Sequence, residues 1–138
     1  MCKDIVIVYW TGTGNTEQLA ESIASGIKDA GGCVDVFNVA DTNADAVAAY
    51  NKIVLGCPAM GDEVLEEGEF EPFYLELESK LAGKTVALFG SYDWGDGEWM
   101  RRWSASAEAA GANVVETLIV QLSEDGSAQA GELGKKLV

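Results

Sequence analysis

Five runs of apolar residues alternate with five longer segments in which apolar and polar residues recur at helical spacing. The runs predict strands at residues 5–10, 34–39, 53–57, 86–90 and 114–120. Because these runs are almost uninterrupted, we expect the strands to be buried on both faces of a sheet. The other segments predict helices at residues 16–30, 45–50, 70–81, 98–110 and 123–137. Regular alternation favours a doubly wound α/β fold, with a five-stranded parallel sheet and helices on both faces.

Three loops follow strands at one predicted edge of this sheet, at residues 11–16, 58–69 and 91–98. In open α/β sheets, ligands bind outside the carboxyl ends of the strands, where the strand order reverses. We therefore expect these three loops to carry the binding site.

The first loop, TGTGNT at residues 11–16, has the composition of an anion-binding site. Glycines allow close backbone approach, and the N-terminus of the next helix attracts phosphate without a cation. No Gly-Lys-Ser/Thr follows, so it is not a Walker loop, and Glu17 stands where a dinucleotide loop has its third glycine. A mononucleotide is the favoured ligand, although a capped glycine turn would explain the glycine pair alone. Asp41 has the spacing of a ribose-binding acid, but we interpret it as an exposed turn residue.

Composition narrows the possible functions of the 138-residue chain, which we expect to form a single domain over residues 1–138. The chain has no histidine, which excludes Ser-His and Cys-His catalysis and histidine-ligated zinc or haem. Its formal net charge of −14 disfavours nucleic acid as a partner and favours basic proteins.

Location and cysteine chemistry are also predicted. No apolar segment is long enough to span a membrane and no signal sequence is recognisable, so we expect a cytoplasmic protein. Cys2, Cys33 and Cys57 are odd in number and lack metal-binding spacing. We interpret all three as reduced packing residues and expect no metal site.

Three strings resemble those of short-chain flavodoxins from clostridia and related anaerobic bacteria. They are YWTGTGNT at residues 9–16, LGCPAMGDE at 55–63 and LFGSYDWGDG at 88–97. The resemblance spans essentially the whole chain, and three matched loops in the same order make it specific. It implies a flavodoxin-like fold with strand order 2-1-3-4-5.

The resemblance also implies a function. It indicates an electron-transfer protein, not an enzyme, that carries one electron at low potential on noncovalently bound FMN, between the semiquinone and hydroquinone states. The expected partners are redox proteins with basic docking surfaces, such as reductases and ferredoxin-linked oxidoreductases. The carrier itself is expected to be a monomer.

By the same resemblance, the first loop holds the FMN phosphate, the loop at Met60 covers the inner face of the flavin ring, and Trp94 covers the outer face. The implied cofactor-binding residues are Thr11, Gly12, Thr13, Gly14, Asn15, Thr16, Pro58, Ala59, Met60, Gly61, Asp62, Glu63, Ser91, Tyr92, Asp93, Trp94, Gly95 and Asp96.

Four of these residues have specific expected roles, two from the resemblance and two from charge. Glu63 accepts a hydrogen bond from the flavin N3–H group. The peptide after Gly61 turns over on reduction, which glycine tolerates because positive φ is accessible to it. Asp62 and Asp93 lower the potential through like charge. Asp93 departs from the family pattern, which has glycine between the tyrosine and the tryptophan.

Other conspicuous residues are assigned to structure. Trp99 and Trp103 recur at helical spacing and predict the buried face of a helix. The acids that follow the second loop are interpreted as surface residues: Glu66, Glu67, Glu69 and Glu71.

Rival functions lack their defining residues. A flavin reductase using NAD(P)H needs a second nucleotide loop, and the only arginines are Arg101 and Arg102. A receiver domain needs an aspartate after the third strand, where this chain has GCP at residues 56–58. A phosphatase built on Cys57 would need an arginine where Glu63 stands.

Overall fold

The computed structural model describes residues 4–10, 14–58, 66–92, 97–121 and 126–138. Its elements alternate as the sequence predicts: β1 (Ile5–Tyr9), α1 (Asn15–Asp29), β2 (Val34–Asn38), the 3-10 helix η1 (Val39–Asp41), α2 (Ala44–Ala48), β3 (Lys52–Gly56), α3 (Phe70–Glu78), β4 (Thr85–Tyr92), α4 (Glu98–Ala109), β5 (Asn113–Gln121) and α5 (Ser127–Leu137). Helix α5 begins at Ser127, later than expected, and η1 was not predicted. In these ranges no helix is both long and apolar enough to cross a membrane.

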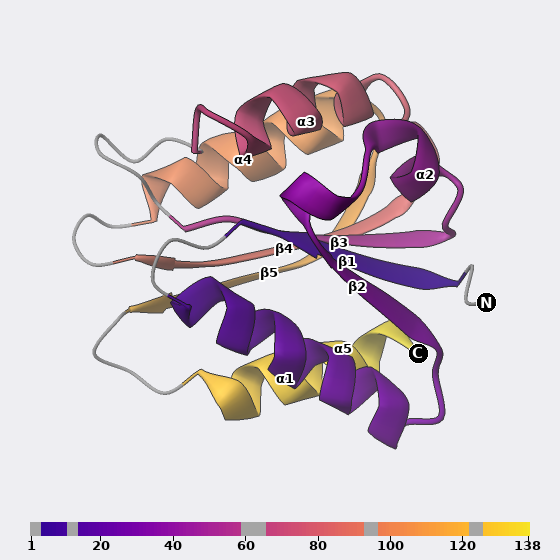
Figure 1. The fold of residues 1–138 in the computed structure, drawn as a ribbon, viewed down its shortest axis with the longest axis vertical. Helices are drawn as coiled ribbons and strands as arrows, with labels where there is room; N and C mark the ends of the chain where they lie inside the picture. Colours follow the sequence, from indigo (N-terminus) through magenta and orange to yellow (C-terminus); the bar gives the residue numbers. More distant parts are fainter. Residues whose placement is uncertain (1–3, 11–13, 59–65, 93–96, 122–125) are drawn as a thin grey trace.

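The five strands form one parallel sheet with the order β2-β1-β3-β4-β5. This confirms the predicted fold class and strand order. Helices α1 and α5 cover one face of the sheet, and α2, α3 and α4 cover the other (Figure 1). Because the strands are parallel, the ends of β1, β3 and β4 lie at one edge of the sheet.

Burial differs between central and edge strands. Strands β1, β3 and β4 are almost fully buried, as predicted. The two edge strands are only partly covered, with Val36 of β2 37% exposed and Val115 of β5 48% exposed. The prediction of burial on both faces is therefore wrong for β2 and β5, because an edge strand has a neighbouring strand on one side only.

Strand β4 is longer than its apolar run. It continues through Ser91 and Tyr92, which pair with Val120 and Gln121 of β5. The apolar run at residues 86–90 predicts a strand that ends before Ser91, with Ser91 and Tyr92 in the loop that follows. Pairing with β5 keeps both residues in the sheet, at its carboxyl edge.

The cysteines do not all behave as predicted. Cys57 is a free, fully buried thiol, in agreement with a packing role. Burial raises the pKa of Cys57 to about 12, which keeps the thiol protonated and unreactive. Cys33 is exposed and disulfide-bonded, so the interpretation as a reduced packing residue is wrong there. Cys2 lies outside the described residues.

Candidate functional site

The ends of the three central strands are held side by side. Beyond β1, the Trp10 N–H donates to the carbonyl of Gly56 over 3.0 Å. Beyond β3, the Cys57 N–H donates to the carbonyl of Phe89 over 3.1 Å. The chain therefore leaves β1 and β3 at neighbouring points of one edge, as the sequence predicted for the first two loops.

Helix α1 begins at this edge, and the last two residues of the predicted phosphate loop, Asn15 and Thr16, lie in its first turn. Gly14 precedes it with φ 95°, in the left-handed region of backbone conformation. Among the described residues, no atom lies within 4 Å of a Cβ added to Gly14, so its left-handed backbone is the feature that favours glycine here. The N-terminus of α1 carries the positive end of the helix dipole, which favours an anion at the sheet edge.

Two buried hydroxyls join the first and third predicted loops. The Oγ1 of Thr16, in the first turn of α1, lies 3.2 Å from the Oγ of Ser91, near the end of β4. Thr16 is 1% exposed and Ser91 4% exposed. Residues 75 positions apart are thus in contact, and both were predicted to bind the cofactor.

Five predicted site residues besides Thr16 fall in the described ranges. Gly14 and Asn15 lie at the start of α1, Ser91 and Tyr92 end β4, and half-buried Pro58 follows β3. The Tyr92 ring packs against Trp99, with the centroids 5.6 Å apart. The other predicted site residues lie outside the described residues: Thr11, Gly12, Thr13, Ala59, Met60, Gly61, Asp62, Glu63, Asp93, Trp94, Gly95 and Asp96.

An acid in the first turn of α1 is held by a tyrosine. The Tyr9 hydroxyl donates to Oε2 of Glu17 over 2.7 Å. Burial, followed by the hydrogen bond to Glu17, raises the pKa of Tyr9 to about 12. The sequence predicts only that Tyr9 lies in a buried strand, and nothing in the sequence spacing indicates this contact.

Glu66 is a second residue whose role was missed. Its carboxylate accepts hydrogen bonds from the N–H groups of Gly68, Glu69 and Phe70, at 2.7, 2.8 and 2.9 Å. It therefore caps the start of α3, a structural role that its interpretation as a surface acid did not include. Glu67 and Glu69 are exposed, as predicted.

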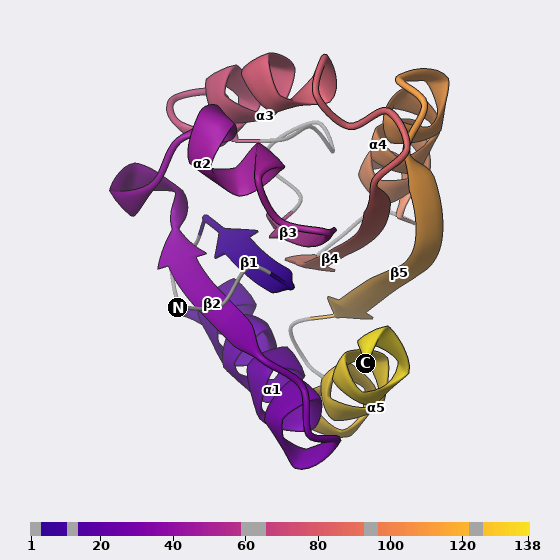
Figure 2. The same cartoon turned by 90° about the vertical axis from the view of Figure 1, so that its right-hand side faces the viewer.

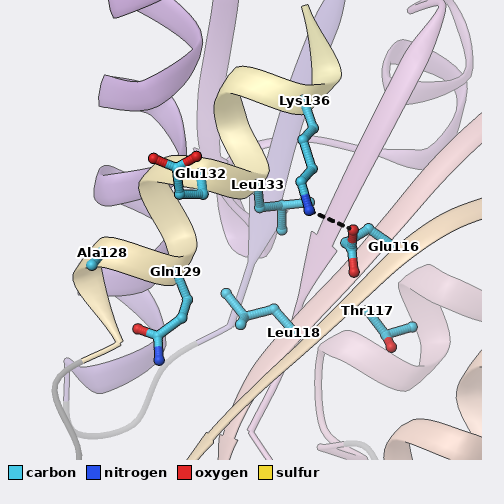
Figure 3. Close-up of a pocket in the computed structure, with 8 residues that line it drawn as sticks. All are labelled: Glu116, Thr117, Leu118, Ala128, Gln129, Glu132, Leu133 and Lys136. Carbon is cyan, nitrogen blue, oxygen red and sulfur yellow. Dashed lines mark ion pairs between the residues drawn. The ribbon is translucent and has the colours of Figure 1, made fainter.

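A groove between β5 and α5 lies elsewhere on the molecule (Figure 3). Leu118 and Leu133 supply apolar lining, and Lys136 forms an ion pair with Glu116 over 3.5 Å. Both charged side chains are well exposed, so the pair contributes little stability. The residues that line this groove include none of those predicted to bind the cofactor.

The chemistry at the carboxyl edge suits a phosphate-bearing ligand. Thr16 and Ser91 carry hydroxyls, Asn15 carries an amide, and α1 directs its positive end to the same place. Within the ranges described, no group of three or more histidine, cysteine or acidic side chains could hold a metal ion. The two hydroxyls, the amide and the helix N-terminus fit a phosphate held by neutral donors.

Comparisons with known proteins agree with this chemistry. The sequence model of the family "Flavodoxin" matches residues 7–134. A flavodoxin of Clostridium beijerinckii is 55% identical over 133 residues, which cover 95% of this chain and 96% of that protein. A flavodoxin of Megasphaera elsdenii is 50% identical over 131 residues, with coverage of 95% and 96%.

The fold leads to the same family. The solution structure of two-electron reduced Megasphaera elsdenii flavodoxin matches with a TM-score of 0.88 and 47% identity, covering 96% of this chain and 97% of that one. The chain therefore belongs to the flavodoxin family, whose members are FMN-binding electron carriers and not enzymes.

Proposed function

We propose that the chain, as a single domain over residues 1–138, carries one electron at low potential on FMN bound at the carboxyl edge of β1, β3 and β4. The observation that carries this proposal is the buried contact between Thr16 and Ser91, which joins the start of α1 to the end of β4. Bound FMN supplies the ability to accept and release one electron at a time.

The start of α1 binds the phosphate. Residues 11–16 contribute hydroxyls, an amide and backbone N–H groups, and the helix dipole stabilises the negative charge. No cation is needed for such a site. Contacts to the ring come from residues 58–63 and 91–96, with Gly61, Asp62 and Asp93 tuning the potential; of these only Pro58, Ser91 and Tyr92 are in the described ranges.

The low potential follows from charge. Adding an electron at this edge is opposed by the net charge of −14 and by nearby acids. One like charge at about 10 Å opposes the added electron by roughly 0.4 kcal/mol in water-like surroundings, and by more where solvent is excluded. Glu98 begins α4 and would also oppose the added electron. Its effect on the potential is reduced because Arg102 lies 3.4 Å from its carboxylate.

Redox proteins are the partners of a carrier in this family, and we propose that they dock through basic surfaces. The negative charge would accelerate association with such partners, and added salt would slow it. The same charge opposes contact between two copies of this chain, which supports a monomer. A cytoplasmic location is part of the same proposal.

The test is an FMN titration followed by stepwise anaerobic reduction with dithionite. The purified apoprotein should bind FMN more tightly than riboflavin, because riboflavin lacks the phosphate. Reduction should then proceed in two separated one-electron steps, with the second potential below that of free FMN. Failure to bind FMN, or reduction in one two-electron step, would contradict the proposal.

A further inference from the structure

Cys57 precedes and Glu66 follows the segment of the chain that supplies the proposed inner-face contacts to the flavin. Both residues are held in place by hydrogen bonds to the rest of the fold. At Cys57, besides the backbone bond to Phe89, the buried indole N–H of Trp99 donates to the carbonyl over 3.3 Å. The Cys57 side chain is fully buried. The Cys57 end of the segment is therefore held by the sheet and by α4.

Glu66 meets Cys57 directly. The Glu66 N–H donates to Sγ of Cys57 over 3.4 Å. Residues nine positions apart are thereby brought into contact, so the two ends of the segment lie together. The same sulfur lies 3.5 Å from the carbonyl of Pro58.

Glu66 is also tied to α3, at both its side chain and its backbone. Beyond the three capping bonds of its carboxylate, its carbonyl accepts the N–H of Glu71 over 2.8 Å. The neighbouring Glu69 carboxylate accepts the indole N–H of Trp10 over 3.4 Å, which links this turn to the end of β1. The Glu66 end of the segment thus depends on the Glu66 side chain, which makes three hydrogen bonds.

The ionisation of Glu66 agrees with this arrangement. Partial burial opposes the charged form, but the N–H groups of Phe70, Glu69 and Gly68 outweigh that effect and lower the pKa of Glu66. The carboxylate is therefore charged near neutral pH, and its three bonds are charge-assisted.

We propose that Glu66 is a positioning residue for FMN binding, because it holds the carboxyl-terminal end of this segment against Cys57 and the start of α3. This inference rests on the proposed function, which places flavin contacts between Cys57 and Glu66. A chain segment with both ends held loses less conformational freedom when a ligand binds to it. Releasing the Glu66 end should therefore weaken FMN binding without removing any atom that touches the flavin.

Two simpler roles for Glu66 make different predictions. A residue that only caps α3 stabilises the apoprotein and the FMN complex equally, and its loss leaves FMN affinity unchanged. A residue that acts only through its charge shifts the potentials as much as a neighbouring exposed acid does. Measurement of affinity and potential together separates these roles from positioning.

Three variants make the test. Glu66→Gln removes the charge and weakens the cap, whereas Glu67→Gln removes the same charge from the adjacent exposed side chain. Gly68→Ala keeps the charge, but its Cβ would lie 2.7 Å from Oε2 of Glu66, so the carboxylate must move. The FMN dissociation constant, both one-electron potentials and the urea stability of the apoprotein are measured for each variant.

We expect Glu66→Gln to weaken FMN binding by about fivefold to tenfold, the size of effect produced when one or two side chains must be ordered on binding. Gly68→Ala should weaken it by a smaller factor, and Glu67→Gln should leave it within about twofold. Equal affinities for Glu66→Gln and Glu67→Gln would overturn the inference, and so would wild-type affinity in both Glu66→Gln and Gly68→Ala. If the wild-type apoprotein itself bound no FMN, the proposed function would fail first, which is a distinguishable result.

Discussion

The two faces of the sheet are covered in different ways. On one face, α1 and α5 lie side by side with their backbones in contact (Figure 2). A Cβ added to Gly26 of α1 would lie 2.1 Å from the carbonyl oxygen of Gly131 in α5, and one added to Gly134 would lie 2.2 Å from that of Ile23. Glycines there let the helices approach to a distance that no side chain would allow.

On the other face, α3 and α4 meet through aromatic rings. Trp103 of α4 packs edge-on against Phe70 and Tyr74 of α3, with centroids 5.5 and 6.0 Å apart. Phe70 also contacts Phe73 at 6.0 Å. The first face should thus be intolerant of added volume, and the second should be intolerant of removed volume.

Removing an aromatic ring should give the largest effect. Trp103 is 3% exposed, and Trp103→Ala would leave a cavity between Phe70 and Tyr74. We expect a loss of about 3–5 kcal/mol of unfolding free energy, measured by urea denaturation of the apoprotein.

Trp103→Phe is the matched control for that variant. It keeps a ring in place and removes an indole N–H that is buried without a hydrogen-bond partner among the described residues. We expect it to lose less than half as much stability as Trp103→Ala. Equal losses would show that this face requires the full indole ring system and that a smaller aromatic ring does not fill the space.

Adding one methyl group should distinguish the glycine face. Gly26→Ala forces backbone atoms of α1 and α5 apart, and we expect a loss of about 1–3 kcal/mol despite the better helix propensity of alanine. Gly131→Ala sits in the same helix pair, but its added Cβ would lie 4.0 Å from the nearest atom, the carbonyl oxygen of Ser22.

The control should therefore change stability in the opposite direction. Gly131→Ala should be neutral or stabilising by up to about 1 kcal/mol, because alanine is the better helix former. Urea denaturation of both variants under the same conditions measures the difference. If Gly26→Ala were as stable as Gly131→Ala, the close approach of the two helices would not limit this face.

The two faces also differ in how far the sequence predicts them. Trp99 and Trp103 at helical spacing correctly indicated a buried helix face, because large apolar side chains carry their own evidence of burial. Gly26, Gly131 and Gly134 gave no such signal. A glycine in a helix predicts only weak helix formation, and its packing role depends on a second helix distant in sequence.

The candidate site shows the same limit. The glycines of residues 11–16 predicted an anion site at the start of α1, because loop composition and position in the fold are both readable from sequence. The contact of Thr16 with Ser91 depends on how far β4 extends, which pairing with β5 determines. Glu66 looked like one of four similar acids, although an acid shortly before a helix is a recognisable capping signal.

The smallest effect that we predict is a pH dependence of stability that is present on the α3 face and absent on the α1–α5 face. The pKa of Glu66 is lowered in the folded protein, so the charged carboxylate contributes stability above its unfolded pKa. That contribution is lost as the pH falls below about 4.5, the ordinary value, towards the folded pKa. The difference in unfolding free energy between wild type and Glu66→Gln should therefore be about 1 kcal/mol at pH 7 and shrink in acid.

The deficit of Gly26→Ala should stay constant over the same pH range, because it arises from backbone contact and involves no titrating group. Urea denaturation of the apoproteins at pH 7, 4 and 3 measures both differences. A pH-independent difference for Glu66→Gln would mean that the neutral carboxyl caps α3 as well as the carboxylate does. The charge of Glu66, and electrostatics with it, would then play no part in the contrast between the two faces.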